Sequence, residues 1–280
     1  GDLLVRAWPA LLILIGLDAL LGRRRVVLGG RSVSLSGVSF AVVLALVGAV
    51  IWLAYQQQAD TLRTDQTQSF SQPLPGDIGQ VEVIAALQRT AVSVGPGDPA
   101  ARTLAADYTG SRDSVVSMTW ETSAGTGTLT ITESAGDAIP RLESYGRAAL
   151  DVRLPQDASI SLLRFASTAG GGTLDLETLR VERVEANLAG GSLVLTLPSE
   201  GALSGRLQVA GGDIELRVPP GVALTVSLAE DSGEPVYVYD EFKYDLLRDG
   251  TLKQENTEEF QAGLTIWLRS GATLRVTDLP

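Results

Sequence analysis

The chain has 280 residues and a formal net charge of −11, with 33 acidic and 22 basic side chains. It contains no cysteine and no histidine, which excludes disulfides, thiolate or imidazole metal sites and histidine-based catalytic triads. Residues 1–58 carry five Arg and two Asp, a net of +3, so the remaining residues carry −14. So acidic a region argues against nucleic-acid binding, and its simplest interpretation is a well-solvated surface.

Two apolar stretches near the start predict a transmembrane helical hairpin over residues 1–55. Residues 37–55 carry no charged side chain, and as a helix rising about 1.5 Å per residue they would cover roughly 28 Å, close to the thickness of a bilayer core. Residues 3–21 include Arg6 and Asp18 near their ends, where charged groups can reach the interface. A signal peptide is the alternative for this first stretch, but the Arg cluster follows the apolar run instead of preceding it. We therefore expect two transmembrane helices.

The charges and aromatic residues around the two spans predict their orientation. The loop between the spans, residues 22–36, contains four arginines: Arg23, Arg24, Arg25 and Arg31. So basic a loop is expected to be cytoplasmic. Trp8, Trp52 and Tyr55 would then form an aromatic belt at the opposite interface. This predicts an integral protein of the cytoplasmic membrane, with everything after Tyr55 on the extracytoplasmic side and the lipid bilayer as a partner.

Small and acidic residues inside the spans predict a second role for the hairpin. Gly16 and Asp18 lie near one another on the first helix, and Gly48 interrupts a run of larger residues on the second. Small residues let helices approach closely in lipid, and an acidic group there is costly unless it reaches water or a partner. We therefore expect Gly16, Asp18 and Gly48 to dock on other membrane proteins. The alternative is that Asp18 simply pairs with Arg23 or Arg24 at the interface.

After the spans the sequence changes to a polar linker and then to short β-type runs. Residues 56–78 are rich in Gln, Thr and Ser and include two prolines, which is typical of a juxtamembrane linker. A mainly β domain is expected over residues 79–280. Its first strands are predicted at Val81–Ile84, Thr90–Val94, Ser114–Trp120, Gly127–Thr132 and Leu150–Leu154. A short helical turn is expected within residues 136–149.

An internal repeat runs through the middle of this domain. Three Gly-Gly pairs are each followed by alternating apolar and polar residues, as in Ile214–Val218, which is the period of a half-buried strand. The second glycines of the pairs, Gly171, Gly191 and Gly212, lie 20 and 21 residues apart. Such spacing favours a β-solenoid, in which stacked coils place glycine at the same positive-φ corner. A row of hairpins is the alternative, because Gly-Gly between strands is also a two-residue hairpin signal.

The end of the domain departs from the repeat. Asp249 and Gly250 predict a tight turn in a charged hairpin that would cap the last coil, since an open sheet edge recruits other chains. A second tight turn is predicted at Ser270 and Gly271. Four aromatic side chains of the same region could form a sugar-stacking platform: Tyr237, Tyr239, Phe242 and Tyr244. The alternative is that these side chains pack in the core or across strands.

No constellation of catalytic or cofactor-binding residues emerges from the sequence. Asp240 and Glu241 would point to opposite faces of a strand and so could not flank one glycosidic bond. A calcium site built from Asp240, Glu241 and Asp245 lacks the twelve-residue loop pattern. The glycines at 170–172 are not followed by the Lys-Ser/Thr of a phosphate loop. We therefore expect a protein that is not an enzyme and holds no metal or cofactor.

The membrane segment and the repeats together resemble a known family. Residues 8–17, Trp-Pro-Ala-Leu-Leu-Ile-Leu-Ile-Gly-Leu, followed by the arginines at 23–25, resemble the membrane module of LiaF-like bacterial envelope proteins. Residues 92–98 and 104–110, with the Gly-Gly repeats after them, are similar to the toastrack domain, also labelled an adhesin domain, that accompanies this module. The resemblance implies a β-solenoid-like domain, a role in envelope stress sensing or protein scaffolding, and no catalytic residues to carry over.

Two functions from different classes follow from these observations. The first is a non-catalytic, membrane-anchored scaffold, sensor or accessory subunit of a bacterial envelope or membrane complex. The second is a surface adhesin or carbohydrate-binding module that uses the aromatic residues of 237–244. A stoichiometric membrane partner on copurification would support the first, and glycan-dependent retention would support the second. Nucleic acid is not an expected partner of so acidic a domain.

Overall fold

The computed structural model describes residues 25–28, 31–34, 45–46, 48–54, 56–57, 61–112, 114–135, 147–254 and 260–280. The chain divides into two compact units, Gly1–Ala59 and Asp60–Pro280. The first predicted span, which includes Gly16 and Asp18, lies outside the described residues.

The first unit contains a short hairpin and helical residues. Strands β1 (Arg25–Leu28) and β2 (Arg31–Ser34) pair antiparallel within the loop predicted between the spans. Residues 45–46, 48–54 and 56–57 are helical, in the second predicted span and just beyond it. Among the described residues, no helix is both long enough and apolar enough to cross a membrane.

The second unit is built from two β-sheets. The eleven-stranded sheet has the order β19 (Tyr244–Leu246), β20 (Leu252–Gln254), β17 (Val222–Leu228), β21 (Phe260–Leu268), β15 (Leu203–Val209), β13 (Arg183–Leu188), β10 (Ser159–Ser167), β4 (Gln80–Leu87), β8 (Thr126–Ala135) and β7 (Ser114–Ser123), with β12 (Arg180–Val181) paired to β10. The nine-stranded sheet has the order β18 (Val236–Val238), β22 (Thr273–Asp278), β16 (Ile214–Val218), β14 (Leu193–Thr196), β11 (Gly172–Asp175), β5 (Thr90–Pro96), β9 (Ala148–Leu154), β6 (Thr103–Gly110) and β3 (Gln66–Pro73). All five of the first predicted strands are present.

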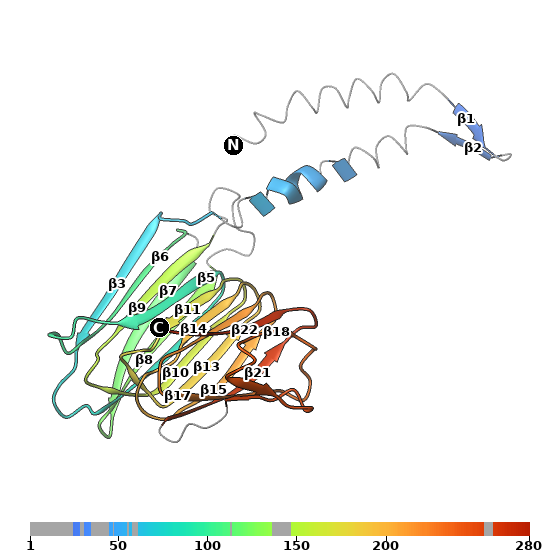
Figure 1. Ribbon diagram of the computed structural model, residues 1–280. Helices are drawn as coiled ribbons and strands as arrows, with labels where there is room; N and C mark the ends of the chain where they lie inside the picture. The colour runs from blue at the N-terminus through green and yellow to red at the C-terminus, as the bar shows by residue number, and fades with distance from the viewer. Residues whose placement is uncertain are drawn as a thin grey trace. The chain divides into compact units, whose positions relative to one another are not determined.

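The Gly-Gly repeats form parallel stacked coils, each with one strand in either sheet. In the eleven-stranded sheet Leu163 pairs with Val184, and in the nine-stranded sheet Leu193 pairs with Ile214, both at an offset of 21 residues. Figure 1 shows β10, β13 and β15 side by side in one sheet, and β11 and β14 adjacent in the other. A row of hairpins would pair antiparallel, so this parallel register fits stacked coils instead.

The glycine alignment drawn from the sequence needs a correction. Because Gly172 pairs with Leu193, the coils place Gly170, and not Gly171, beside Gly191 and Gly212. The repeat is therefore 21 residues in both steps. Of these glycines only Gly191 has a positive φ, +81°. A Cβ on Gly212 would lie 2.5 Å from the Gly191 carbonyl oxygen, so close stacking of the coils, and not a left-handed backbone, requires glycine there.

Two coils stand out of chain order in the stack. The coil of β4 and β5 lies between those of β8–β9 and β10–β11, and the coil of β21 and β22 lies between those of β15–β16 and β17–β18. Each inserted coil is therefore hydrogen-bonded on both sides, to segments distant in sequence. These insertions join both ends of the stack to its repeating middle.

The core lies between the two sheets because side chains alternate inward and outward along each strand. In β4 the side chains of Val81, Val83, Ala85 and Leu87 are buried, and those between them are not. β9, β13 and β16 alternate in the same way. One continuous cluster of buried apolar residues results, and it includes the large aromatic side chains of Tyr108, Phe165 and Tyr244. Each fully buried large side chain contributes about 1.5–3 kcal/mol relative to an exposed one.

Three further expectations change with the structure. Residues 66–73 are strand β3, paired antiparallel with β6, so the predicted linker of 56–78 ends earlier than expected. Ser270 and Gly271 do form a turn, but it connects β21 to β22 in the other sheet and does not close a hairpin. Of the helical turn expected at 136–149, residues 136–146 lie outside the described residues and 148–149 belong to β9.

Candidate functional site

Exposed apolar side chains gather at one end of the stack. Of the seven large apolar residues that are exposed in the described part of the second unit, five lie within residues 236–247. We call these five the apolar rim: Val236, Val238, Phe242, Leu246 and Leu247. They belong to β18, β19 and the adjoining turns, and β18 and β19 are the edge strands of the two sheets. Exposed apolar groups beside open strand edges are typical of a surface that contacts another molecule.

The four aromatic residues predicted as a binding surface have three different environments. Tyr244 is buried, and its hydroxyl donates to Asp278 Oδ1 over 3.0 Å. Tyr237 and Tyr239 are partly buried against the core, with their ring centroids 6.5 Å apart in an edge-to-face arrangement. Phe242 alone is fully exposed. The structure therefore does not bring the four rings together as a platform, and Tyr244 belongs to the core.

The tyrosines instead hold the rim in place. The Tyr237 hydroxyl donates to the Gly250 carbonyl over 2.9 Å, which ties β18 to the turn of the β19–β20 hairpin. Burial is the main cause that raises the pKa of Tyr237, and the charge of the Asp249 carboxylate raises it further. Burial and the adjacent Asp278 carboxylate raise the pKa of Tyr244 well above its usual value. Both hydroxyls thus stay protonated donors at neutral pH.

Turn residues present the exposed ring of Phe242. Asp240 Oδ1 accepts a hydrogen bond from the Phe242 backbone N–H over 3.0 Å, and Lys243 forms an ion pair with Asp278 over 3.0 Å. The predicted capping hairpin is present, with φ of +80° at Gly250. Backbone and side-chain hydrogen bonds from Thr251 lower the pKa of Asp249 in this turn. The rim is therefore a fixed structure and not a loose loop.

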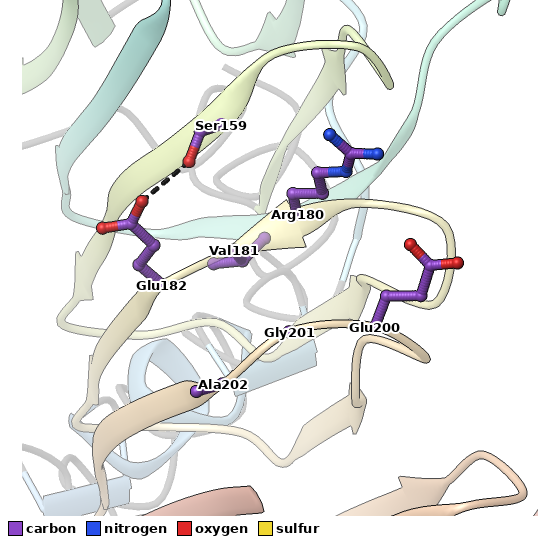
Figure 2. A pocket seen from close by; sticks show the side chains of 7 residues that line it. All are labelled: Ser159, Arg180, Val181, Glu182, Glu200, Gly201 and Ala202. Atoms are coloured by element: carbon purple, nitrogen blue, oxygen red, sulfur yellow. Dashed lines mark hydrogen bonds between the residues drawn. The ribbon is translucent and has the colours of Figure 1, made fainter. Parts of the chain in front are cut away.

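A groove follows one corner of the coils, where the ladder between two coils is interrupted. β12 pairs with β10 but not with the segment that precedes β15, which leaves a hollow of about 350 Å³. Figure 2 shows its lining: Ser159, Arg180, Val181, Glu182, Glu200, Gly201 and Ala202. The Ser159 hydroxyl donates to Glu182 over 2.8 Å. A neighbouring hollow of about 260 Å³ shares Arg180 and Glu200.

A shallow depression of about 410 Å³ lies on the nine-stranded sheet where the outward residues of β5 are small. Asp107 and Asp151 are direct cross-strand neighbours in it. Arg153 forms an ion pair with Asp151 over 2.8 Å, which offsets part of the repulsion between the two carboxylates. Within the described residues, Asp240, Glu241 and Asp245 included, no three carboxylates are arranged to hold a metal ion.

A buried carboxylate lies at the opposite end of the stack from the rim. Glu133 on β8 is buried and accepts five hydrogen bonds. Its donors are the backbone N–H groups of Gln88 and Arg89 and the hydroxyls of Thr90, Tyr108 and Ser114. Burial, and also the charge of Glu133, raises the pKa of Tyr108 to about 12. The network joins the β4–β5 corner to β6, β7 and β8, which is a structural role.

The sequence did not reveal the apolar rim as a unit, because Leu246 and Leu247 look like ordinary strand residues. Glu133 was also missed, since an acidic residue in a Thr-rich strand normally indicates the solvent face. Of the three residues predicted to dock in the membrane, only Gly48 is described. It is helical, and a Cβ built there would meet no described atom within 4 Å.

The fold is similar to that of a solved protein. The crystal structure of a "putative cell adhesion protein" from Clostridium sporogenes ATCC 15579 matches with a TM-score of 0.62 at 8% sequence identity. The match covers 76% of this chain and 100% of the other. At that identity the likeness concerns the fold alone. No protein-family model matches the sequence, and no curated protein does.

Proposed function

We propose that this chain is a non-catalytic, membrane-anchored scaffold, sensor or accessory subunit of a bacterial envelope complex, and that its β domain binds a protein partner through the apolar rim. The observation that carries the proposal is the concentration of exposed apolar side chains on Val236, Val238, Phe242, Leu246 and Leu247, five of the seven such residues in the described part of the second unit. Aromatic and aliphatic side chains that become buried on binding dominate the energetics of protein interfaces. Phe242, which is fully exposed in the chain alone, is a side chain of this kind.

The apolar stretch of 37–55 supports the anchoring part of this proposal, and the basic loop before it supports an extracytoplasmic β domain. The likeness to a toastrack or adhesin domain supports an interaction role and no reaction. The "putative cell adhesion protein" from Clostridium sporogenes has the same kind of fold, which is compatible with the second candidate, a surface adhesin.

Copurification of the full chain in mild detergent tests the proposal. Phe242→Asp removes an exposed ring whose side chain has no contact to lose, so folding should be unaffected. We expect it to reduce recovery of a stoichiometric protein partner by about thirtyfold, the effect of a 2 kcal/mol hot spot. Val115→Asp is the matched control, because Val115 is similarly apolar and exposed but lies on β7 at the other end of the sheet.

The control variant should retain the partner. If both variants retain every protein recovered with the unmodified chain, the rim is not the binding surface. Retention of glycan with no protein partner recovered would contradict the scaffold assignment and support the adhesin.

A further inference from the structure

The outer face of the eleven-stranded sheet carries a row of amide and indole side chains. Asn187 on β13 pairs in register with Gln208 on β15, and Gln208 pairs with Trp267 on β21. Asn187 and Gln208 are exposed, and neither amide has a hydrogen-bond partner in the described part of the chain. The indole N–H of Trp267 donates to the Asp231 carbonyl over 2.9 Å, which fixes the orientation of the partly exposed ring.

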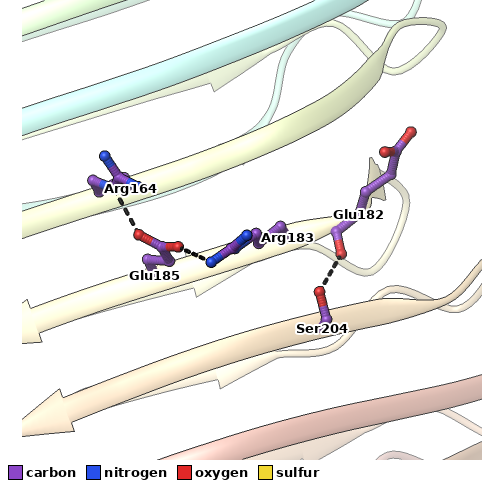
Figure 3. Close-up of polar contacts among 5 residues, drawn as sticks. All are labelled: Arg164, Glu182, Arg183, Glu185 and Ser204. Carbon is purple, nitrogen blue, oxygen red and sulfur yellow. Dashed lines mark hydrogen bonds and ion pairs between the residues drawn. The ribbon is translucent and has the colours of Figure 1, made fainter.

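The next row on the same face is basic. Arg164, Glu185 and Arg206 are register neighbours on β10, β13 and β15. Glu185 forms ion pairs with Arg164 over 2.7 Å and with Arg183 over 2.6 Å, as Figure 3 shows. The hydrogen bond from Arg164 is the main reason why the pKa of Glu185 is lowered.

Arginines outnumber carboxylates on this face. Glu185 is the one acidic residue in the sequences of β10, β13, β15 and β21, and it is already shared by two guanidinium groups. Arg206 is exposed and carries no ion pair or hydrogen bond within the described part of the chain. Three arginines against one glutamate give these four strands a charge of +2, in a region of the chain whose net charge is −14.

We propose that this surface, the arginine face, binds an anionic polysaccharide. It consists of six residues: Arg164, Arg183, Asn187, Arg206, Gln208 and Trp267. The guanidinium groups would pair with carboxylate or phosphate groups along the polymer, the two amides would hydrogen-bond its hydroxyls, and the indole would stack on a sugar ring. Adjacent strands lie about 4.8 Å apart, so the four strands offer a flat surface roughly 14 Å wide.

A polysaccharide fits this face better than a protein does. Protein interfaces need an apolar centre, and none of the exposed large apolar residues found in the described part of the chain lies on β10, β13, β15 or β21. A purely structural ion-pair ladder would account for Arg164, Arg183 and Glu185. It would not account for the unpaired Arg206 or for two free amides in register with an oriented indole.

Binding of four polymers to the full chain in detergent tests this proposal. The probes are polygalacturonate, a glycerol-phosphate polymer, neutral dextran and poly-L-glutamate. We expect salt-sensitive binding of at least one of the two anionic polymers with sugar or polyol backbones. Which of the two binds more tightly distinguishes carboxylate from phosphate recognition.

The variants locate the binding. Arg206→Gln breaks no ion pair or hydrogen bond within the described part of the chain and should weaken binding at least tenfold. Trp267→Ala should do the same. Lys253→Gln removes an exposed cation near the edge of the same sheet and should change binding less than twofold. Phe242→Asp, which tests the rim, should leave polysaccharide binding unchanged, so this proposal and the proposed function can fail separately.

Three results would overturn the assignment. The first is that neither polygalacturonate nor the glycerol-phosphate polymer binds. The second is an equal loss of binding in Lys253→Gln and Arg206→Gln, which would indicate non-specific attraction. The third is that poly-L-glutamate binds as tightly as polygalacturonate or the glycerol-phosphate polymer.

Discussion

The middle of the stack and its two ends are built on different principles. In the middle, coils follow one another every 21 residues, and buried aliphatic side chains repeat at equivalent positions, as in Leu195 and Leu216. At the ends the repeat stops. One end holds a buried carboxylate with five donors, and the other holds fixed tyrosines beneath exposed apolar residues.

This difference shows where a repeat domain can carry specificity. Inside the stack each residue must satisfy the coils above and below, so the choice of residue is restricted. An end coil has a neighbour on one side only and is free to present side chains to a partner. The outer sheet faces are also free of this constraint, which is why the arginine face can occur on coils that are otherwise regular.

The largest expected effect concerns the stacking glycines. In Gly191→Val the new Cβ would lie 2.5 Å from Gly171 N at a positive φ, so we expect a loss of about 4 kcal/mol in the free energy of unfolding. Gly263→Val is the matched control, because Gly263 is exposed on β21 and a Cβ added there would meet nothing within 4 Å. It should change stability by less than about 1 kcal/mol in urea unfolding. Similar losses in both variants would contradict close coil stacking.

Gly233 lies in the connection between β17 and β18 but would not serve as a control. A Cβ there would collide with the backbone N of Ser270. We therefore expect a larger loss of stability from a Val at Gly233 than at Gly263.

The buried carboxylate at the other end gives the next largest effect. Glu133→Ala leaves five donors without their acceptor and should cost about 3 kcal/mol of unfolding free energy. Glu133→Gln keeps one acceptor oxygen and should cost less. Glu121→Ala, an exposed position on the neighbouring β7, should stay within about 0.5 kcal/mol. Chemical denaturation of the three variants measures this, and an unchanged free energy of unfolding in Glu133→Ala would show that the network does not stabilise this end of the stack.

The same network predicts a loss of stability at alkaline pH. The pKa of Tyr108 is raised to about 12 in the folded protein, whereas an unfolded tyrosine ionises near pH 10. Between these values the unfolded chain releases a proton that the folded protein keeps, so stability falls as pH rises. The expected contribution is about 1.4 kcal/mol per pH unit. Tyr108→Phe should have a shallower slope between pH 10 and 12, and equal slopes in both proteins would contradict the assignment.

The smallest effect is expected on the sheet face. Glu185→Gln removes both ion pairs to Arg164 and Arg183, whose side chains are 48% and 61% exposed. Solvent-exposed pairs contribute little, so the loss should be under about 1 kcal/mol and should shrink as salt is added. A larger, salt-independent loss in thermal unfolding would mean that the face is structural and not a binding surface.

The sequence predicted individual strands better than it predicted the order in which they stack. The strand around Val81–Ile84 and the alternation after Gly191 follow from residue period alone. Residues 66–73 have the Gln-, Thr- and Ser-rich composition that is typical of a linker, but backbone pairing to β6 makes them a strand. The period of apolar and polar residues shows which side chains of a strand point inward, but it does not show which other strand pairs with it. It therefore could not place β21 and β22 inside the stack.

Site-specific crosslinking in native membranes tests most directly whether binding belongs to the end of the stack. A photoreactive amino acid replaces Phe242 in one variant and Val115 in another, two exposed apolar positions at opposite edges. Binding through the end of the stack predicts a discrete protein adduct from position 242 and none from position 115. An adduct from position 115 alone, equal adducts from both positions, or none from either, would contradict it.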